Sequence, residues 1–181
     1  MSKKPPVTLL IVASSFSPLA MTALVPGLPA IGDEFDLPLS TVQFVISIYL
    51  LGLALAQPVH GALADRFGRR PVFLLGFGVF ILASLACALC STMPWLVLFR
   101  LLQAAGIATA TVVTRAMLRD IFDIDDSARY TAYLSGGMGV ATMLAPALSG
   151  YLIETWGWRL SFYAMAALAL PVFLRLFAAR P

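Results

Sequence analysis

Six apolar runs, each about 20 residues or longer, dominate the sequence and leave only short polar stretches between them. A helix of about 20 apolar residues matches the thickness of the hydrocarbon core of a membrane. Of the 181 residues, 60% are hydrophobic and only 12% are charged. A soluble domain of this size cannot bury that much apolar surface. The chain is therefore predicted to be an integral membrane protein.

The runs predict an all-α membrane bundle, because they are continuous and lack the alternation of a membrane β-barrel. The predicted spans cover residues 8–31, 40–64, 71–90, 95–118, 130–153 and 160–178. Six prolines lie in the interior of these spans, at Pro18, Pro26, Pro29, Pro58, Pro146 and Pro171. Neighbouring helices can satisfy the backbone groups that a proline frees, so we expect kinked helices.

The distribution of lysine and arginine predicts the orientation of the spans. One side of the membrane receives both termini and the loops after the second and fourth spans. That side holds Lys3, Lys4, Arg66, Arg69, Arg70, Arg115, Arg119, Arg129, Arg175 and Arg180, whereas the other side holds only Arg159. Because positively charged loops stay in the cytoplasm, both termini are predicted to be cytoplasmic.

The net charge of +3 therefore reflects membrane topology. No patch of interleaved basic and aromatic residues predicts nucleic-acid binding. Cys87 and Cys90 form a C-x-x-C pattern inside an apolar run with no histidine or acid nearby, so we interpret them as packing thiols and expect no metal site. No cofactor motif or nucleophile–base pair stands out, and we expect no enzymatic activity.

Residues 119–126 mix charged and apolar side chains after the fourth span. Two interpretations remain open for this stretch. It is either an amphipathic turn on the membrane surface or a solvated loop.

An internal repeat relates the two halves of the chain through a shift of 89 residues, which places residues 61–70 against 150–159. The matched identities are Gly61 with Gly150, Leu63 with Leu152, Gly68 with Gly157 and Arg70 with Arg159. An odd number of spans separates the two copies, so the repeats, about 8–90 and 95–178, are inverted within a single six-span domain covering 1–181. Inverted three-span repeats are a feature of secondary transporters. Chance similarity of two short hairpins is the alternative.

Residues 61–70 place four charges in one short loop. Gln57, Gly61 and Asp65 are spaced by four, so they share one helix face. Asp65 lies at the end of a helix, where the helix dipole disfavours an anion, and it requires cationic partners. Gly68 permits a sharp turn. The alternative, a basic loop that only sets topology, explains the arginines but not this register.

The pattern G-x-x-x-D-R-x-G-R-R, at Gly61, Asp65, Arg66, Gly68, Arg69 and Arg70, resembles the cytoplasmic loop motif of the major facilitator superfamily. The resemblance implies a cytoplasmic gate, in which the acid and basic residues pair with one another, with the fourth span and with a second half of the transporter. It also implies a role for Asp120, and we predict a cluster of Asp65, Arg69 and Asp120.

The fourth span carries Arg100, Gln103 and Gly106, with Ala104 between them. This resembles the family's R-x-x-Q-G motif, with Ala104 in place of the first glycine. An arginine at the membrane centre costs about 2.5–3.5 kcal/mol on insertion scales, so it normally faces a polar cavity or a partner. The alternative is a structural arginine that reaches toward the membrane surface.

Small residues recur along the fifth span, where a stripe of this kind lets two helices pack closely. They are Gly137, Ala141, Ala145 and Ser149, with Pro146 and Gly150 on the adjacent face. The stripe resembles the family's antiporter motif G-x-x-x-G-P-x-x-G-G, although several glycines are replaced. General helix packing is the alternative interpretation.

Residues 17–29 are similar to the first span of bicyclomycin/chloramphenicol-type drug/proton antiporters. Thr22 stands where those transporters often carry an acid. His60, the only histidine, is interpreted as an interfacial residue rather than a proton carrier. The resemblance implies proton-coupled efflux of small amphipathic compounds by alternating access. The expected cavity residues are Met21, Thr22, Tyr49, Arg100 and Gln103.

The resemblance covers the whole chain but only six of the family's twelve spans, so we expect an N-terminal half. The expected location is the bacterial inner membrane, and the expected partners are lipid, a small-molecule substrate and a second six-helix half. That half is either a missing C-terminal half or a homodimer mate. The alternative function is a truncated or standalone half, which acts as a membrane interaction module without transport activity.

Overall fold

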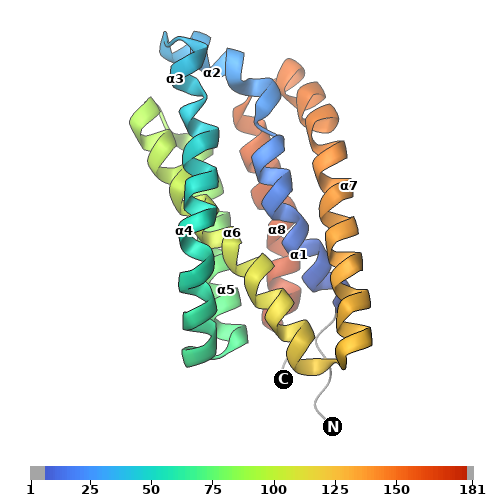
Figure 1. Cartoon of the computed structure of the whole chain (residues 1–181). Coiled ribbons are helices and arrows are strands. Elements are labelled where there is room, and N and C mark those ends of the chain that lie inside the picture. Colours follow the sequence, from blue (N-terminus) through green and yellow to red (C-terminus); the bar gives the residue numbers. More distant parts are fainter. Residues whose placement is uncertain (1–6, 179–181) are drawn as a thin grey trace.

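The computed structural model describes residues 7–178, and this part of the chain is built from helices without any strand (Figure 1). Six helical segments within it are long and apolar enough to cross a membrane. The predicted all-α, six-span architecture is therefore confirmed. Lys3, Lys4 and Arg180, which contributed to the predicted orientation, lie outside the described residues.

The first span is interrupted where the sequence carries two prolines. Helix α1 (Val7–Thr22) is followed by a short 3₁₀ turn, η1 (Val25–Gly27), and by α2 (Leu28–Phe35). Pro26 and Pro29 lie in the first turns of η1 and α2, where a missing backbone N–H costs no hydrogen bond. The break therefore turns the end of this span into a separate short helix.

The remaining helices follow the predicted order. They are α3 (Leu39–Val42), α4 (Phe44–Phe67), α5 (Arg69–Leu89), α6 (Met93–Ile121), α7 (Ile124–Trp156) and α8 (Arg159–Ala178). The stretch 119–126 is not an extended loop, because α6 runs to Ile121, α7 begins at Ile124 and a tight turn at Phe122 and Asp123 connects them. The carboxylate of Asp123 accepts a hydrogen bond from the backbone N–H of Asp126 at 2.9 Å, which caps α7.

The helices form one bundle with two distinguishable ends. Figure 1 shows α4, α6, α1 and α7 across the bundle, with α5 and α8 behind them. The α4–α5 turn at Gly68, the start of α1 and the end of α8 lie at one end, here named the Gly68 end. The α7–α8 turn at Gly157 lies at the opposite end, here named the Gly157 end.

Helix α6 is the centre of the packing, since α4, α5 and α1 all contact it. A Cβ atom added to Gly106 would lie 2.6 Å from the backbone nitrogen of Phe80, and one added to Gly52 would lie 2.9 Å from the Cβ of Ala104. Glycine therefore allows the backbones of α5 and α4 to approach α6 closely. This packing places the polar residues of α6 inside the bundle.

Candidate functional site

Three helices meet at the Gly68 end in an ion-pair cluster of Asp65, Arg69 and Asp120, here named the Arg69 cluster. Asp65 lies at the end of α4, Arg69 begins α5 and Asp120 lies near the end of α6. A guanidinium nitrogen of Arg69 lies 2.5 Å from Asp65 Oδ1, and Arg69 Nε donates to Asp120 Oδ2 at 3.0 Å. These are the three residues that were predicted to form a cluster.

The Arg69 cluster lies at the surface of the bundle. The side chains of Asp65 and Asp120 are 66% and 53% exposed, and that of Arg69 is 27% exposed. Exposed pairs of this kind contribute about 0.2–1 kcal/mol, because water screens them. The cluster is therefore a weak contact, which can open at small cost.

The other residues of the loop motif have separate positions. Gly68 adopts φ 94° and ψ 150°, a conformation that only glycine tolerates well. Arg70 donates to the backbone carbonyl of Phe177, near the end of α8, at 2.8 Å. The Arg66 guanidinium lies over the ring of Phe67, 5.2 Å from its centroid. A Cβ atom added to Gly61 would lie 3.9 Å from Val112 of α6, an ordinary contact that does not itself require glycine.

A second polar cluster lies in the interior of the bundle and consists of Tyr49, Ser84, Arg100 and Gln103, here named the Arg100 cluster. A guanidinium N–H of Arg100 donates to Gln103 Oε1 at 2.7 Å and to the carbonyl of Ala20 at 3.1 Å. The amide nitrogen of Gln103 donates to the hydroxyl of Ser84 at 2.7 Å. The cluster thus joins α1, α4, α5 and α6.

Arg100 has no exposed surface, and no ion pair stabilises its charge among the described residues. Its guanidinium lies 4.2 Å from the ring centroid of Tyr49 and 5.8 Å from that of Phe162. Within residues 7–178, its Nε and one terminal nitrogen have no hydrogen-bond partner. A carbonyl, a side-chain amide and two aromatic rings therefore surround the positive charge of Arg100. Part of the hydrogen-bonding capacity of its guanidinium is unused.

The five expected cavity residues fall into two groups. Tyr49, Arg100 and Gln103 have no exposed surface. Met21 and Thr22 are half-buried on α1, directly after Ala20, whose carbonyl binds Arg100. Contact between the buried group and a transported compound would require α1 or α4 to move.

The stripe of small residues on α7 packs against α1. A Cβ atom added to Gly137 would lie 3.0 Å from Ile11 of α1 and 3.3 Å from the hydroxyl of Ser15. Ala145 and Ser149 are buried, whereas Ala141, Pro146 and Gly150 are half-buried. The stripe thus provides close packing between the first helix of the first repeat and the second helix of the second repeat.

The structure also contains polar contacts that the sequence did not predict. At the Gly157 end, Arg159 binds both carboxylate oxygens of Glu34 at 2.6 Å, and Trp158 Nε1 donates to the same carboxylate at 2.8 Å. These three residues are here named the Glu34 cluster. The internal repeat matches Arg159 with Arg70, but Glu34, the partner of Arg159, lies 125 positions away in the sequence. The sequence signal for Ser84 is its hydroxyl group inside an otherwise apolar run.

Comparison with known proteins adds a family to this geometry. A family model described as the Major Facilitator Superfamily matches residues 10–181. An uncharacterized transporter of Rickettsia bellii is 33% identical over 159 residues, which cover 88% of this chain and 39% of the relative.

Two further relatives are similar over the same region. Multidrug resistance protein MdtL of Escherichia fergusonii is 32% identical over 157 residues, covering 87% of this chain and 40% of the relative. The uncharacterized MFS-type transporter YvkA of Bacillus subtilis is 28% identical over 154 residues, covering 85% of this chain and 35% of the relative. The chain thus matches between 35% and 40% of the length of these three relatives.

Proposed function

Since the chain belongs to the major facilitator superfamily, we propose that it supplies the N-terminal six-helix half of a proton-coupled drug efflux transporter. A second six-helix half completes the transport path, and the two halves alternate between inward-open and outward-open arrangements. The relatives include a protein named for multidrug resistance, which supports small amphipathic compounds as substrates. Both termini lie in the cytoplasm, and the membrane is the bacterial inner membrane.

An unpartnered face of α7 carries this proposal. Ser135, Gly136, Gly139 and Thr142 are exposed along one side of this helix, and a Cβ atom added to either glycine would meet nothing within 4 Å. Of the six spans, α7 has the smallest buried share in its 18-residue apolar window, 11%. Small residues are enriched where transmembrane helices pack together, so this face fits a helix of the second half.

The Arg69 cluster serves as part of the cytoplasmic gate in this proposal. It joins the ends of α4, α5 and α6 through exposed ion pairs, each of which is weak enough to break in a transport cycle. The gate is completed by contacts with the second half and closes the Gly68 end in the outward-open state.

The Arg100 cluster lies beneath the proposed substrate path. Met21 and Thr22 line this path on α1, and movement of α1 breaks the bond between Arg100 and the carbonyl of Ala20. The freed guanidinium then reaches a substrate or an acid of the second half. Because Thr22 replaces the acid that such antiporters often carry in this span, the coupling proton is carried by another group.

Flux across liposomes tests the proposal. The protein, joined to a second half of the same family, is reconstituted with ethidium as the transported cation and an imposed proton gradient as the driving force. We expect the gradient to raise ethidium flux at least tenfold. Gly139→Leu should abolish this flux, because its side chain would block the second half from approaching α7.

Leu170→Phe is the matched control, because Leu170 is exposed on α8, away from the α7 face. It should transport normally and reconstitute at the same level. Absence of gradient-driven flux in the unsubstituted protein would contradict proton-coupled efflux. If the chain also fails to crosslink to a second half through a cysteine at position 139, it acts as neither a transporter half nor a partner of one.

A further inference from the structure

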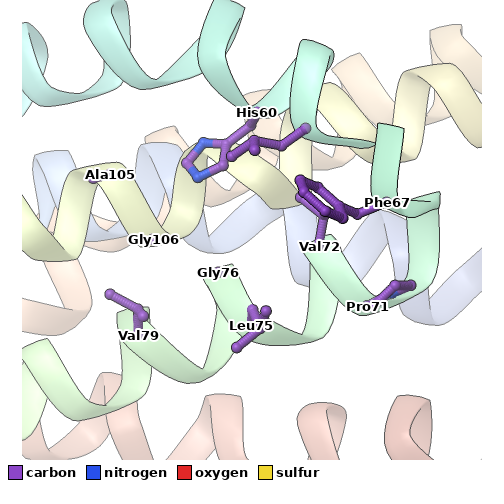
Figure 2. A pocket seen from close by; sticks show the side chains of 10 residues that line it. His60, Phe67, Pro71, Val72, Leu75, Gly76, Val79, Ala105 and Gly106 are labelled. Atoms are coloured by element: carbon purple, nitrogen blue, oxygen red, sulfur yellow. The ribbon is translucent and has the colours of Figure 1, made fainter. Parts of the chain in front are cut away.

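A groove between α4 and α5 opens on the side of the bundle and has α6 as its floor. Figure 2 shows His60 and Phe67 on the α4 wall, Leu75 and Val79 on the α5 wall, and Ala105 and Gly106 behind them. Its volume is about 590 Å³. His60 is the one polar side chain in the lining, so the groove suits an apolar occupant.

The groove exists because α4 and α5 diverge from the sharp turn at Gly68 while both pack against α6. Helices α4 and α5 make far less contact with each other than each makes with α6. Gly76 and Gly106 bring α5 and α6 together at the floor, where a Cβ atom on Gly106 would lie 2.7 Å from the carbonyl oxygen of Gly76. The floor is therefore bare of large side chains.

The groove extends through one leaflet of the membrane. His60 and Val79 are 8 and 11 residues from Gly68, which corresponds to about 12 Å and 17 Å along a helix. Half the thickness of the hydrocarbon core is about 15 Å. A lipid chain in the leaflet at the Gly68 end has the length and the depth to lie along this groove.

The rim of the groove is apolar and open to the surroundings. Phe67, Leu75 and Val79 are 59%, 71% and 40% exposed. Neither wall belongs to α7, the helix that we assign to contact with a second half. We therefore place this open side of the groove toward lipid.

A positive charge stands at the mouth of the groove. Arg66 lies over the ring of Phe67 at 5.2 Å, and Phe67 lines the groove. No described carboxylate pairs with Arg66, whereas Arg69 nearby has two. An unpaired guanidinium at the membrane surface attracts the phosphate of an anionic lipid.

We infer that this groove binds one acyl chain of an anionic phospholipid, with the lipid phosphate held by Arg66 at the Gly68 end. The apolar walls recognise the chain, and the charge selects the headgroup. The occupant is thus a specific lipid of the leaflet at the Gly68 end, which is distinct from a transported compound.

Site-specific quenching tests the inference in nanodiscs. A small fluorophore is attached through Leu75→Cys at the rim, since Cys87 and Cys90 are buried and resist labelling. The quenchers are phosphatidylglycerol and phosphatidylcholine carrying the same nitroxide on an acyl chain, at equal mole fraction. We expect phosphatidylglycerol to quench at least twice as strongly, and Arg66→Gln to make the two lipids equal.

Three controls separate this site from general lipid contact. Arg66→Lys should retain the preference because it retains the charge. Arg119→Gln, which removes an exposed arginine on α6, should leave the preference unchanged. A fluorophore placed through Leu170→Cys on the exposed face of α8 should show no preference.

Other results would overturn the inference. If both lipids quench a fluorophore at position 75 equally while Arg66 is present, the groove binds lipid chains without selecting the headgroup. A preference that survives Arg66→Gln removes Arg66 from the site. Quenching by neither lipid shows that chains do not enter, and loss of quenching on addition of ethidium assigns the groove to a transported compound.

Discussion

The two hairpins of the internal repeat, 61–70 and 150–159, share a turn but use their charges differently. Gly68 and Gly157 adopt similar conformations, with φ/ψ of 94°/150° and 84°/162°. Each glycine N–H bonds the carbonyl four residues earlier, at 3.1 Å for Gly68 and 2.9 Å for Gly157. The turn geometry therefore belongs to the repeat and not to either side of the membrane.

The last arginine of each hairpin also has the same role. Arg70 donates to the carbonyl of Phe177, near the end of α8, at 2.8 Å, and Arg159 donates to that of Cys90, next to the end of α5, at 3.0 Å. Since α5 and α8 are the third spans of the two repeats, each repeat caps the closing helix of the other. A cation suits this place, because the C-terminal end of a helix carries partial negative charge.

The acids distinguish the two hairpins. At the Gly157 end, Arg159 caps α5 and also binds Glu34. At the Gly68 end, Arg70 caps α8, while Arg69 binds the acids separately. The buried Trp158 stands at the position equivalent to Arg69. The Arg69 cluster is thus additional to the contacts that hold the bundle, which leaves it available for a moving contact.

The largest effect expected is shared by both hairpins. Gly68→Ala and Gly157→Ala each force a side chain into a conformation that costs about 1–3 kcal/mol. Both variants should lose about 2 kcal/mol of unfolding free energy, measured by titration with sodium dodecyl sulfate in mixed micelles. A loss at only one position would show that the two turns are not equivalent.

An intermediate effect should separate the two capping arginines. Arg159→Met removes bonds to Glu34 and to the end of α5, and we expect a loss of about 1.5 kcal/mol after allowance for partial exposure. Arg70→Met removes only the carbonyl bonds at the end of α8 and should cost about 1 kcal/mol. The same titration measures both.

The control for this pair is Arg119→Met, for which the described residues show no ion pair and little change is expected. A double-substitution cycle that combines Arg159→Met with Glu34→Gln measures how much of the stability lost in Arg159→Met comes from the contact with Glu34. If Arg70→Met lowers the unfolding free energy more than Arg159→Met does, Arg159 does not stabilise the Gly157 end through both Glu34 and the end of α5.

The smallest effect on stability is expected for the Arg69 cluster. The coupling energy between Arg69→Gln and Asp120→Asn should be below about 1 kcal/mol, because both side chains are partly exposed. Under the proposed function, each variant should nonetheless lower ethidium flux several-fold. A coupling larger than that between Arg159 and Glu34 would show that the Arg69 cluster is structural.

Much of the fold was predictable because lipid simplifies the problem. Each span must satisfy its own backbone, so length and hydropathy alone locate the helices. The extent of α7 was underestimated, because Asp125 and Asp126 signal a solvated loop to a hydropathy count but favour the start of a helix electrostatically. The break in the first span was visible only as two prolines.

The candidate site was predictable where its residues are close in sequence or belong to a known pattern. Asp65 and Arg69 are four apart, and Asp120 came from the family resemblance. Glu34 and Ser84 have no local signal for their partners, since Arg159 and Gln103 reach them only after the helices pack. Distant polar contacts of this kind depend on helix rotation, which hydropathy does not specify.

The Arg100 cluster also has consequences for the order in which the chain is made. The carbonyl of Ala20, the ring of Tyr49 and the hydroxyl of Ser84 all precede Arg100 in the sequence. Each of these groups is therefore synthesised before the charged span leaves the ribosome. The ring of Phe162, which lies on the guanidinium from α8, follows two helices later. A chain growing from its N-terminus thus has one acceptor and one ring for Arg100 already made, Gln103 follows three residues later, and the last helix completes the enclosure.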